Sequence, residues 1–571
     1  MELSPAFPNR RRYGLTGTVL ACLTLLVSGA TGCVPAGAAG GGAIGGSSAA
    51  RSAFGRLDER QRIGSFSTIE AVAVTRRFVF AGGSGGIAVY DRLRDVWMPP
   101  LTRDNGFMDQ QITVMAGDPV EDALWFGVPG GVATYRPQTE QLQRTMLTGV
   151  PDVIAFDRRG TGDAMVRAGG SWTRVSRIGL TTPMNGAPAA NSVIVPSNLG
   201  ELYQRYPTLR IQPQSLLRNQ SPNRPLQQFA LLSGAASPDR VNDVWLGTDG
   251  DGLYRLDPAF LQAQPLRFGL LEPGVGALAL AADGVWAAGL GQSMRRGGLS
   301  FTTPDLQRWR WIEGTIGVPL TGLRTYALAT RANRAWLGTA RGLVRVFLDG
   351  ANDMTAWTAF DGLPDERVLA VAPRDDGVWV GTPRGVVRIS DSLDTKPRET
   401  RGLGARLLEN VPVYALQFTG DTLWMGTEGG VVALPRAEAG GGTLLRPLGD
   451  DPALRRPVRS LAYSDSVLLA ATDNAVLAVA PRGGRAPQRV DALNLVHVGQ
   501  VTRVGIDARA MWAAGMNGLV IVSRTSGAVR VVSAVDLGGP VLDVVANTDW
   551  MWIGTPQGLV RLRRSSDGLT Y

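Results

Sequence analysis

Residues 378–389 read Val-Trp-Val-Gly-Thr-Pro-Arg-Gly-Val-Val-Arg-Ile, an apolar run, a Gly-Thr-x-x-Gly sequence and a second apolar run. Short apolar runs on either side of a glycine-containing turn are typical of two strands in a β-hairpin. Trp379, Gly381 and Thr382 are the residues by which this hairpin can be recognised elsewhere in the chain. The rest of the fold is built outward from this unit.

The same motif returns along most of the chain. Strict copies contain Trp336, Gly338, Thr339, Trp424, Gly426, Thr427, Trp552, Gly554 and Thr555. Looser copies are anchored at Phe80, Trp125, Trp245, Trp286, Leu469 and Trp512, and the turn after Trp245 is longer by one residue. From Trp245 onward the anchors recur every 40 to 50 residues. Such a period, with several short strands per repeat, indicates a β-propeller.

The repeat around Trp379 shows how many strands one blade needs. Val368–Val371 is expected to be its inner strand, Val378–Val380 its second and Val386–Ile389 its third, while Ala356–Phe360 would be the outer strand of the preceding repeat. Four short strands punctuated by Gly and Pro make one propeller blade. We therefore predict an all-β protein of four-stranded blades.

The blade count predicts two rings. Between Trp125 and Trp245 there is room for two further blades, one at Met165–Val175 and one at Val193–Tyr203 with Ile194 as its anchor. The total is then about twelve blades across residues 56–571, whereas one ring usually closes with roughly four to eight. Two rings are expected, with their boundary left open.

The last repeat lacks an outer strand. After Trp552 only one more strand, Leu559–Leu562, precedes the end of the sequence at Tyr571. Because an unpaired edge would leave the ring open, residues 57–66 are expected to supply the missing strand. The two ends of the repeat region would then share one ring, and the other ring would be inserted in the middle or stacked beside it.

The pattern that starts at Asp361-Gly362-Leu363-Pro364 and continues through Gly377-Val378-Trp379-Val380-Gly381-Thr382 to Arg388 resembles the two-component regulator propeller repeat. That family is known from periplasmic sensor regions of hybrid histidine kinases. The resemblance implies a propeller fold and a sensor-like binding role. No part of this sequence resembles a kinase or a response regulator, so signal output by this chain alone is not implied.

The N-terminus reads as an export signal. Arg10 to Arg12 are followed by the apolar run Leu15–Ala30 and by small residues before Cys33. This resembles the lipobox of bacterial lipoproteins, which implies removal of residues 1–32, acylation of Cys33 and a flexible Gly/Ala/Ser linker over 33–55. The alternative is an ordinary cleavable signal. We expect an exported protein anchored in the cell envelope, on the periplasmic side of the outer membrane.

The repeated motif residues are expected to serve the scaffold. Each tryptophan would pack between neighbouring blades, and each first glycine would allow close backbone approach. The second glycine would adopt positive φ, and the threonine hydroxyl would bond the turn backbone. A catalytic site is needed once, so a feature that recurs in nearly every repeat indicates structure.

The composition leaves little material for catalysis. His497 is the only histidine, its neighbours are apolar, and a structural role is expected for it rather than a Ser-His-Asp triad. The cysteines are Cys22 and Cys33 alone, so we predict no metal site, no cofactor and no catalytic residue. Asp249-Gly250-Asp251-Gly252 carries too few carboxylates to predict a calcium site and fits a hairpin turn.

Function is predicted at the level of binding. We expect a non-enzymatic propeller that binds an envelope protein or a small or saccharide ligand, as a sensor or a scaffold, and meets the membrane through its lipid. The net charge of +9 is spread over scattered arginines, so no nucleic-acid partner is expected. The alternative is a propeller lyase or glycoside hydrolase, which would need two Asp or Glu residues facing each other in a channel, roughly 5–9.5 Å apart for hydrolysis.

Overall fold

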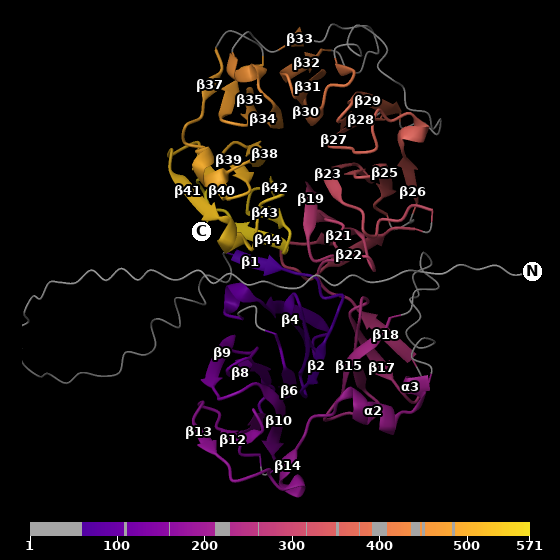
Figure 1. The fold of residues 1–571 in the computed structure, drawn as a ribbon, viewed down its shortest axis with the longest axis vertical. Helices are drawn as coiled ribbons and strands as arrows, with labels where there is room; N and C mark the ends of the chain where they lie inside the picture. Colours follow the sequence, from indigo (N-terminus) through magenta and orange to yellow (C-terminus); the bar gives the residue numbers. More distant parts are fainter. Residues whose placement is uncertain are drawn as a thin grey trace, which may run out of the picture. The chain divides into compact units, whose positions relative to one another are not determined.

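The computed structural model describes residues 60–570, except for 108–110, 159, 212–228, 261, 316, 350–352, 376, 391–407, 436–445, 448–451 and 482–485. These residues form eleven antiparallel sheets in which strands consecutive in sequence pair side by side (Figure 1). Each sheet is one propeller blade, so the predicted all-β, multi-blade propeller is confirmed. The blades are distributed between two groups, which we call ring 1 and ring 2.

Ring 1 contains four blades, whose inner strands are β2, β6, β10 and β15. Its strands are β2 (Ala71–Val74), β3 (Phe78–Gly83), β4 (Gly86–Asp91), β5 (Val96–Leu101), β6 (Val114–Gly117), β7 (Leu124–Val128), β8 (Gly131–Arg136), β9 (Gln141–Met146), β10 (Pro151–Asp157), β11 (Ala164–Ala168), β12 (Ser171–Val175), β13 (Thr181–Pro183), β14 (Val193–Ile194), β15 (Leu231–Ala236), β16 (Val244–Thr248), β17 (Leu253–Asp257) and β18 (Gln262–Leu266). Strand β2 contacts both β6 and β15, so the first blade packs against the last.

One position of ring 1 holds helices instead of a blade, which corrects the prediction for residues 193–203. Only β14 forms there, paired with β10, and the chain then enters helices α2 (Leu199–Arg205) and α3 (Thr208–Ile211). Pro196 lacks the N–H that a strand ladder needs, and the Asn198 side chain caps α2 by accepting from the Glu201 N–H at 3.1 Å. Leu202 and Leu209 of these helices cover the apolar face of the β15–β18 blade.

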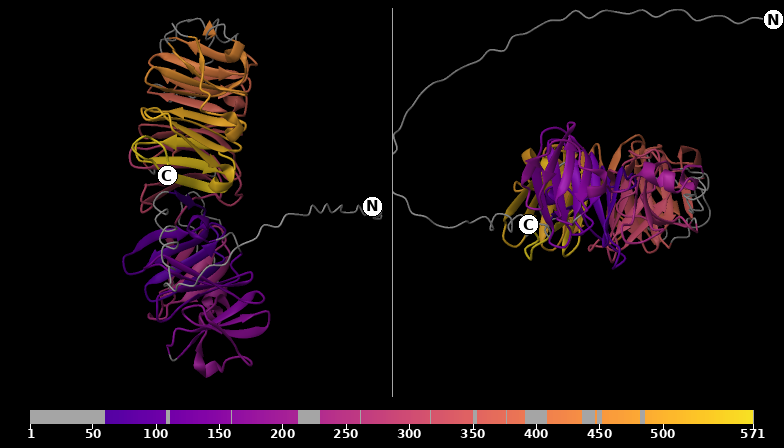
Figure 2. Two further views of the ribbon diagram at one scale, coloured as in Figure 1. Left: turned by 90° about the vertical axis from the view of Figure 1, so that its left-hand side faces the viewer. Right: turned by 90° about the horizontal axis from the view of Figure 1, so that it is seen from below.

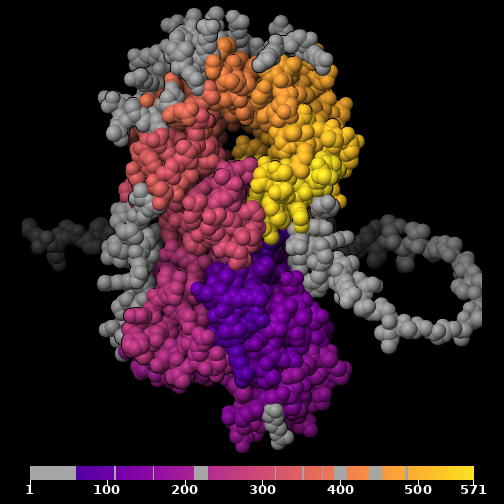
Figure 3. Space-filling view, turned by 180° about the vertical axis from the view of Figure 1, so that it is seen from behind, coloured from indigo at the N-terminus to yellow at the C-terminus, as the bar shows by residue number. Residues whose placement is uncertain are grey.

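Ring 2 contains seven blades in the described residues. Its strands are β19 (Val275–Leu280), β20 (Val285–Gly289), β21 (Gly298–Thr302), β22 (Trp309–Glu313), β23 (Thr325–Arg331), β24 (Arg334–Thr339), β25 (Gly342–Phe347), β26 (Met354–Trp357), β27 (Ala370–Arg374), β28 (Gly377–Thr382), β29 (Gly385–Ser390), β30 (Val413–Thr419), β31 (Thr422–Thr427), β32 (Gly430–Leu434), β33 (Arg446–Pro447), β34 (Val458–Ser464), β35 (Val467–Thr472), β36 (Val476–Val479), β37 (Gln488–Arg489), β38 (Val501–Ile506), β39 (Ala510–Gly515), β40 (Gly518–Ser523), β41 (Val529–Ser533), β42 (Asp543–Ala546), β43 (Trp550–Thr555) and β44 (Gly558–Arg563). Each inner strand contacts the next, and β42 contacts β19, so the blades close into a circle. Figure 3 shows a hollow in the middle of this ring.

Short helical turns join some of these strands. They are η1 (Arg103–Asn105), η2 (Ala190–Ser192), η3 (Ala359–Asp361), η4 (Pro452–Arg455), α6 (Leu495–Val498) and α7 (Ala534–Leu537). The predicted outer strand Ala356–Phe360 is corrected here, because β26 ends at Trp357 and Phe360 belongs to η3. Thr358 and Asp361 form a capping box around η3, which turns the chain at that point.

The N-terminal strand closes ring 2. Strand β1 (Arg60–Ile63) pairs antiparallel with β44, with Arg60 opposite Leu562 and Ile63 opposite Leu559, and supplies the outer strand that the last blade lacks. In Figure 1 this indigo strand lies beside the yellow end of the chain, and Figure 2 shows ring 2 from two further directions. The predicted pairing with the final blade is therefore confirmed for residues 60–63, whereas residues 57–59 lie outside the described residues, and ring 1 is inserted in the sequence between β1 and β19.

The two connections between the rings lie against each other. Ser65 bridges Gly269 and Leu270, and the Leu270 N–H donates to the Gly64 carbonyl at 3.1 Å. Aromatic side chains continue this contact, because Phe268 stacks on Trp97 of ring 1 at 4.8 Å and meets Trp309 of ring 2 at 5.5 Å.

A buried ion cluster joins ring 1 to ring 2. Asp251 of ring 1 pairs through Oδ1 with Arg296 at 2.9 Å and with Arg267 at 3.2 Å. Both arginines also contact Glu313 of β22, and Asp251, Arg296 and Glu313 are all buried. Asp251 belongs to the one Gly-Thr turn that is a residue longer than the others, so the irregular repeat supplies this contact between the rings.

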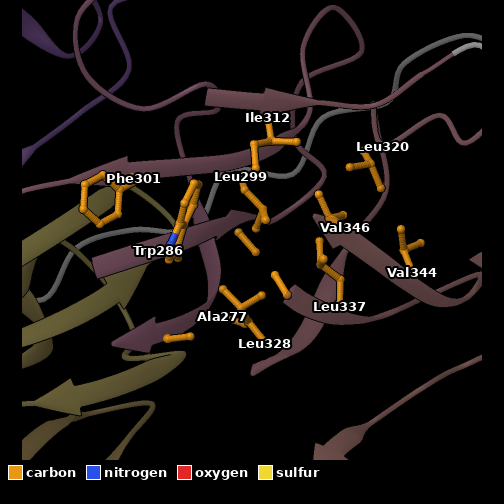
Figure 4. Close-up of a cluster of buried hydrophobic side chains, with 13 residues drawn as sticks. Ala277, Trp286, Leu299, Phe301, Ile312, Leu320, Leu328, Leu337, Val344 and Val346 are labelled. Atoms are coloured by element: carbon orange, nitrogen blue, oxygen red, sulfur yellow. The ribbon is translucent and has the colours of Figure 1, made fainter. Parts of the chain in front are cut away.

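Each blade hides one face against the next. In the first two blades of ring 2, Trp286, Leu299 and Phe301 belong to one buried cluster with Leu337 and Val346 of the neighbouring sheet, and Phe301 lies beside Trp286 (Figure 4). These side chains are almost completely buried. Burial of large apolar side chains between sheets is the main favourable term that holds the blades together.

Candidate functional site

The structure places the predicted motif tryptophans on the second strand of each blade. All of them are buried, and each one packs against the adjoining blade. The set comprises Trp125, Trp245, Trp286, Trp336, Trp379, Trp424, Trp512 and Trp552. Trp552 of the last blade of ring 2 lies in one cluster with Val275 and Val285 of the first, so the motif also spans the point of closure.

The motif threonines hold the hairpin turns. The hydroxyls of Thr339, Thr382, Thr427 and Thr555 each donate to the carbonyl of the second glycine of their turn, at 2.7 to 3.0 Å. The same hydroxyl accepts a turn N–H, as in Thr427, which accepts from Gly429 at 3.2 Å. Every one of these hydroxyl groups is buried and used within its own blade.

The first glycine of each motif lets the next blade approach. A Cβ added at Gly426 would lie 2.7 Å from the Val458 carbonyl oxygen, and one at Gly338 would lie 2.8 Å from that of Val368. Gly381 and Gly554 meet Val413 and Val275 in the same way. The motif residues are therefore engaged in packing, and a binding surface has to be sought on other side chains.

The Gly-Thr turns and the connections between blades lie at one end of ring 2, which we call the turn face. Backbone hydrogen bonds tie several of these turns to the start of an inner strand, for example Ala340 N–H to Arg324 O at 3.0 Å and Glu428 N–H to Pro412 O at 3.1 Å. The Asn517 carbonyl accepts from Ala534 of α7 at 2.8 Å. The short helices η3, α6 and α7 therefore belong to this end.

The turn face exposes large apolar side chains. Phe360 on η3 is 99% exposed, and Met294, Val535, Val496 and Met516 are also exposed on turns or short helices of this face. Among the described residues of ring 2, the other exposed large hydrophobic side chains are Val529 and Val531, both on the outer strand β41. Exposed apolar side chains that gather on one face mark interaction sites.

Two arginine–tyrosine pairs lie at the beginnings of the inner strands β23, β30 and β34, on the turn face. The Arg459 guanidinium lies 4.1 Å from the ring centroid of Tyr414, and that of Arg324 lies 5.1 Å from Tyr326. Tyr414 donates its hydroxyl to Glu428 at 2.6 Å, and burial together with this bond raises its pKa. Tyrosine, arginine and methionine are enriched at protein–protein interfaces.

Carboxylates in the described residues are mostly engaged by arginine. Asp249 and Asp251 of the Asp-Gly-Asp-Gly turn pair with Arg295 and with the buried ion cluster, so arginines occupy the oxygens that a cation would need. The inner strands of ring 2 carry a single carboxylate, Asp543, which accepts from Arg503 at 2.5 Å and from the Leu278 N–H at 2.8 Å. No opposed carboxylate pair is present on those strands.

The described residues offer no group of three or more His, Cys, Asp or Glu side chains that could hold a metal ion. His497, for which a structural role was expected, is exposed on α6 rather than packed in the core. Cys33, the signal over 1–32 and the whole linker over 33–55 lie outside the described residues. Within the described part of the chain, no helix is long and apolar enough to cross a membrane.

Comparison with known proteins shows the fold. No family model matches the sequence, and no curated protein matches it. The chain is similar to a solved structure of PorZ, described as an essential bacterial surface component of the type-IX secretion system of Porphyromonas gingivalis. The TM-score is 0.53 at 12% identity, over 88% of this chain and 87% of that one. At this identity the likeness establishes the architecture alone.

Two further solved structures share less of the arrangement. The extracellular domain of the putative one-component system BT4673 from B. thetaiotaomicron aligns over 88% of this chain and 76% of its own, at 16% identity and a TM-score of 0.31. Virginiamycin B lyase from Staphylococcus aureus aligns over 51% of this chain and 95% of its own, at 13% identity and a TM-score of 0.40. With TM-scores this low, neither likeness bears on function.

Proposed function

We propose that this protein is a non-enzymatic, lipid-anchored propeller outside the cytoplasm that binds another protein of the cell envelope through the turn face of ring 2. The observation that carries the proposal is that Phe360, Met294 and Val535 are exposed on turns and short helices at that end of ring 2. A phenylalanine that is 99% exposed keeps apolar surface in contact with water in the free protein, and burial in a pocket of a partner would remove that surface from water.

The polar part of the turn face favours a partner with acidic groups. Arg324, Arg341 and Arg384 are exposed around the same turns, and planar guanidinium groups bind carboxylates in bidentate geometry. The Arg459–Tyr414 pair adds an aromatic ring and a guanidinium group at the beginnings of the inner strands β30 and β34. We therefore expect the partner segment to combine apolar side chains with Asp or Glu.

Anchoring at Cys33 would place this surface at the membrane. The Gly/Ala/Ser composition of residues 36–50 suits a tether rather than a packed element, so the propeller would stand off the lipid on a flexible linker. We propose the periplasmic side of the outer membrane as its site. Incorporation of labelled fatty acid that is lost in Cys33→Ser tests the anchor, and equal labelling of both proteins would contradict it.

The enzymatic alternative, a propeller lyase or glycoside hydrolase, has no observation in its favour. Its carboxylate pair would be expected on the inner strands that line a ring, and those of ring 2 carry only the arginine-paired Asp543. The inner strands of ring 1 carry Asp152 and Asp157, which both lie on β10 rather than on strands that face each other, and Asp152 is paired with Arg167 at 2.7 Å.

Site-specific photo-cross-linking in cells tests the binding surface. A photoreactive amino acid replaces Phe360 or Met294 on the turn face, and Val529 on the outer strand β41 serves as the matched exposed control. We expect the first two positions to yield the same protein adduct, identified by mass spectrometry, and the control to yield none. Absence of an adduct at both turn-face positions, or the same adduct at Val529, would contradict the proposal.

A purified variant provides the second test. Phe360→Ser should abolish copurification of the cross-linked partner while leaving the thermal midpoint unchanged, because the side chain has no packing to lose. Val529→Ser is the control and should retain the partner.

A further inference from the structure

A cavity of about 300 Å³ lies at the junction of the rings, and we call it the junction pocket. Three parts of the chain supply most of its walls: Arg62 of β1, Thr102 and Phe107 after β5, and the Pro556-Gln557 turn of the last blade of ring 2. Pro273, just before β19, completes this set. A cavity of this size can hold one large side chain of a partner.

One part of the lining is apolar. Phe107, Pro273 and Pro556 are its apolar side chains, and each of them carries a ring. An aromatic side chain can pack flat against such rings, and its burial removes roughly 150–250 Å² of surface from water. This part of the junction pocket therefore favours an aromatic group.

Two polar side chains of the lining have atoms free to form hydrogen bonds. Arg62 Nη2 donates to the Asp536 carbonyl at 3.0 Å, whereas no described residue accepts from its Nη1. The backbone N–H of Gln557 donates to Thr555 Oγ1 at 3.2 Å, but its side-chain amide bonds no group in the described part of the chain. The two free groups lie together, because a Cβ added at Gly538 would be 2.7 Å from Arg62 Nη1 and 3.0 Å from Gln557 Oε1.

A hydroxyl group matches this pair of polar side chains. Its oxygen can accept from Arg62 Nη1 while its own proton is donated to Gln557 Oε1. A group without a hydroxyl would displace water from both side chains and leave them without partners, which costs free energy. Together with the apolar rings of the lining, this arrangement favours a phenol over a plain benzene ring.

One side of the junction pocket adjoins Val535 of the turn face. Val535 and Asp536 are neighbours on α7, and the Asp536 carbonyl is the group that accepts from Arg62. A single hydrogen bond therefore joins the lining of the pocket to a short helix that exposes a large apolar side chain.

The other side adjoins the loop of Met294. Gly274 follows Pro273 of the lining, and a Cβ added at Gly274 would lie 2.6 Å from Gln292 Oε1 and 2.9 Å from the Pro556 carbonyl oxygen. Gln292 precedes Met294 by two residues. A protein that covers both Met294 and Val535 would therefore also lie over the junction pocket.

We propose that the junction pocket binds a tyrosine side chain of the protein that contacts the turn face, an inference that rests on the function proposed above. The phenol ring packs against Phe107, Pro273 and Pro556, and its hydroxyl bonds Arg62 and Gln557. Buried tyrosines commonly supply much of the affinity of a protein interface. The bound ring contacts ring 1 through Phe107 and ring 2 through Pro556.

Saturation-transfer NMR titrations of the purified protein test the pocket without the partner. The probes are N-acetyl-tyrosinamide and N-acetyl-phenylalaninamide, which differ only in the hydroxyl. We expect saturable binding of the tyrosine probe and about 5-fold weaker binding of the phenylalanine probe. Failure of the tyrosine probe to bind, or equal affinity for both probes, would overturn the proposal.

Substitution of Gln557 locates the binding site. Gln557→Ala keeps the backbone N–H that bonds Thr555 and should weaken binding of the tyrosine probe about 5-fold, with no change for the phenylalanine probe. Gln488→Ala, at an exposed glutamine on the outer strand β37, is the matched control and should bind both probes like the wild-type protein. Wild-type affinity of Gln557→Ala for the tyrosine probe would contradict the assignment.

Cross-linking in cells separates this inference from the proposed function. A photoreactive amino acid replaces Ser84, an exposed residue of the β3–β4 turn that lines the pocket, and Ser171, exposed at the start of β12, is the control. We expect Ser84 to capture the protein that is captured at Phe360 and Met294, and Ser171 to capture none. Capture at Phe360 and Met294 but not at Ser84 would overturn the pocket alone, whereas no capture at any of the three would contradict the turn face as well.

Discussion

Ring 2 and ring 1 are built from the same kind of blade but reach closure differently. Ring 2 carries the strict Trp–Gly-Thr unit in four of its seven blades and looser copies in the other three, and it uses β1 from the start of the described chain to complete the last. Ring 1 has four blades, and the helices α2 and α3 occupy a further position. The two rings therefore close in different ways. The more regular ring 2 closes through the pairing of β1 with β44, whereas in the irregular ring 1 the helices α2 and α3 cover the apolar face of the β15–β18 blade.

Removing β1 should give the largest effect. A chain that starts at residue 65 loses the outer strand of the last blade and leaves β44 as an unpaired edge, so ring 2 should lose cooperative unfolding or associate through that edge. A chain that starts at residue 56 keeps β1 and is the matched control. Thermal unfolding and size-exclusion chromatography measure both. Indistinguishable behaviour of the two truncations would contradict closure by β1.

The contact between the rings should be the next most sensitive feature. Arg296→Ala leaves Asp251 and Glu313 buried with one fewer cation, and loss of one partner from a buried ion cluster costs about 3–5 kcal/mol. Arg308→Ala, which breaks the exposed pair with Asp283, should cost about 0–1 kcal/mol. Urea denaturation compares the two variants. A similar small loss in both would show that the ion cluster contributes little to joining the rings.

Glu272, just before the chain enters ring 2, should make stability depend on pH. Burial raises the pKa of this carboxyl to about 7 from 4.5, against the N–H donors of Gly291 and Gln292. The folded state thus holds a proton that the unfolded chain releases, so the free energy of unfolding falls as pH rises from about 4.5 to about 7 and then levels off.

Glu272→Gln removes that dependence, because a neutral amide oxygen can still accept both N–H groups. We expect the variant to match the wild-type protein near pH 4 and to be more stable by about 1–3 kcal/mol above pH 7. Thermal midpoints across pH 4 to 8 measure the effect, with Glu70→Gln at an exposed position as the control. Parallel pH curves for Glu272→Gln and the wild-type protein would contradict the assignment.

Substitutions that remove side-chain hydrogen bonds within a single turn or helix should cause the smallest loss of stability. Thr427→Val removes the hydroxyl that bonds Gly430 and Gly429 in a ring 2 turn, and Asn198→Ala removes the cap of α2 in ring 1. Each should cost about 1 kcal/mol. Thr182→Val at an exposed position is the control for urea denaturation. If only one of the two substitutions lowers the free energy of unfolding, the hydrogen bonds removed by the other do not contribute to stability.

The sequence predicted the blades wherever the repeat follows its rules. Phe80, Leu469 and the eight motif tryptophans all lie on second strands, because the hairpin signal is local and every copy reinforces the others. The pairing of the first and last strands was also predictable, since an unpaired outer strand leaves an edge that some segment has to cover.

The predictions from sequence were wrong where hydrophobic spacing and helix-capping residues indicate different structures. The run Val193–Tyr203 imitates a blade hairpin in its apolar spacing, but Pro196, Asn198 and Glu201 together specify a helix start. Thr358 and Asp361 likewise turn the chain before Phe360 can join β26. Both capping patterns are visible in the sequence and outweigh hydrophobic spacing at those points.

The candidate binding surfaces could not be predicted, because they depend on contacts between distant segments. Arg62, Thr102 and Pro556 line one cavity although they belong to three separate parts of the chain. The side chains of the turn face gather from different blades, and no spacing in the sequence reveals which connections leave a phenylalanine or methionine exposed.

Cross-linking the two ends of ring 2 tests the central claim most directly. In a chain whose Cys22 and Cys33 are replaced by serine, cysteines at Gln61 and Arg561, which face each other across β1 and β44, should form an intramolecular disulfide under mild oxidation. A pair at Gln61 and Arg530, on β41 of the preceding blade, should not. The account predicts a cross-link in the first pair alone, detected by peptide mass spectrometry. No disulfide between 61 and 561, or equal yield in both pairs, would contradict the closure of ring 2 by its N-terminal strand.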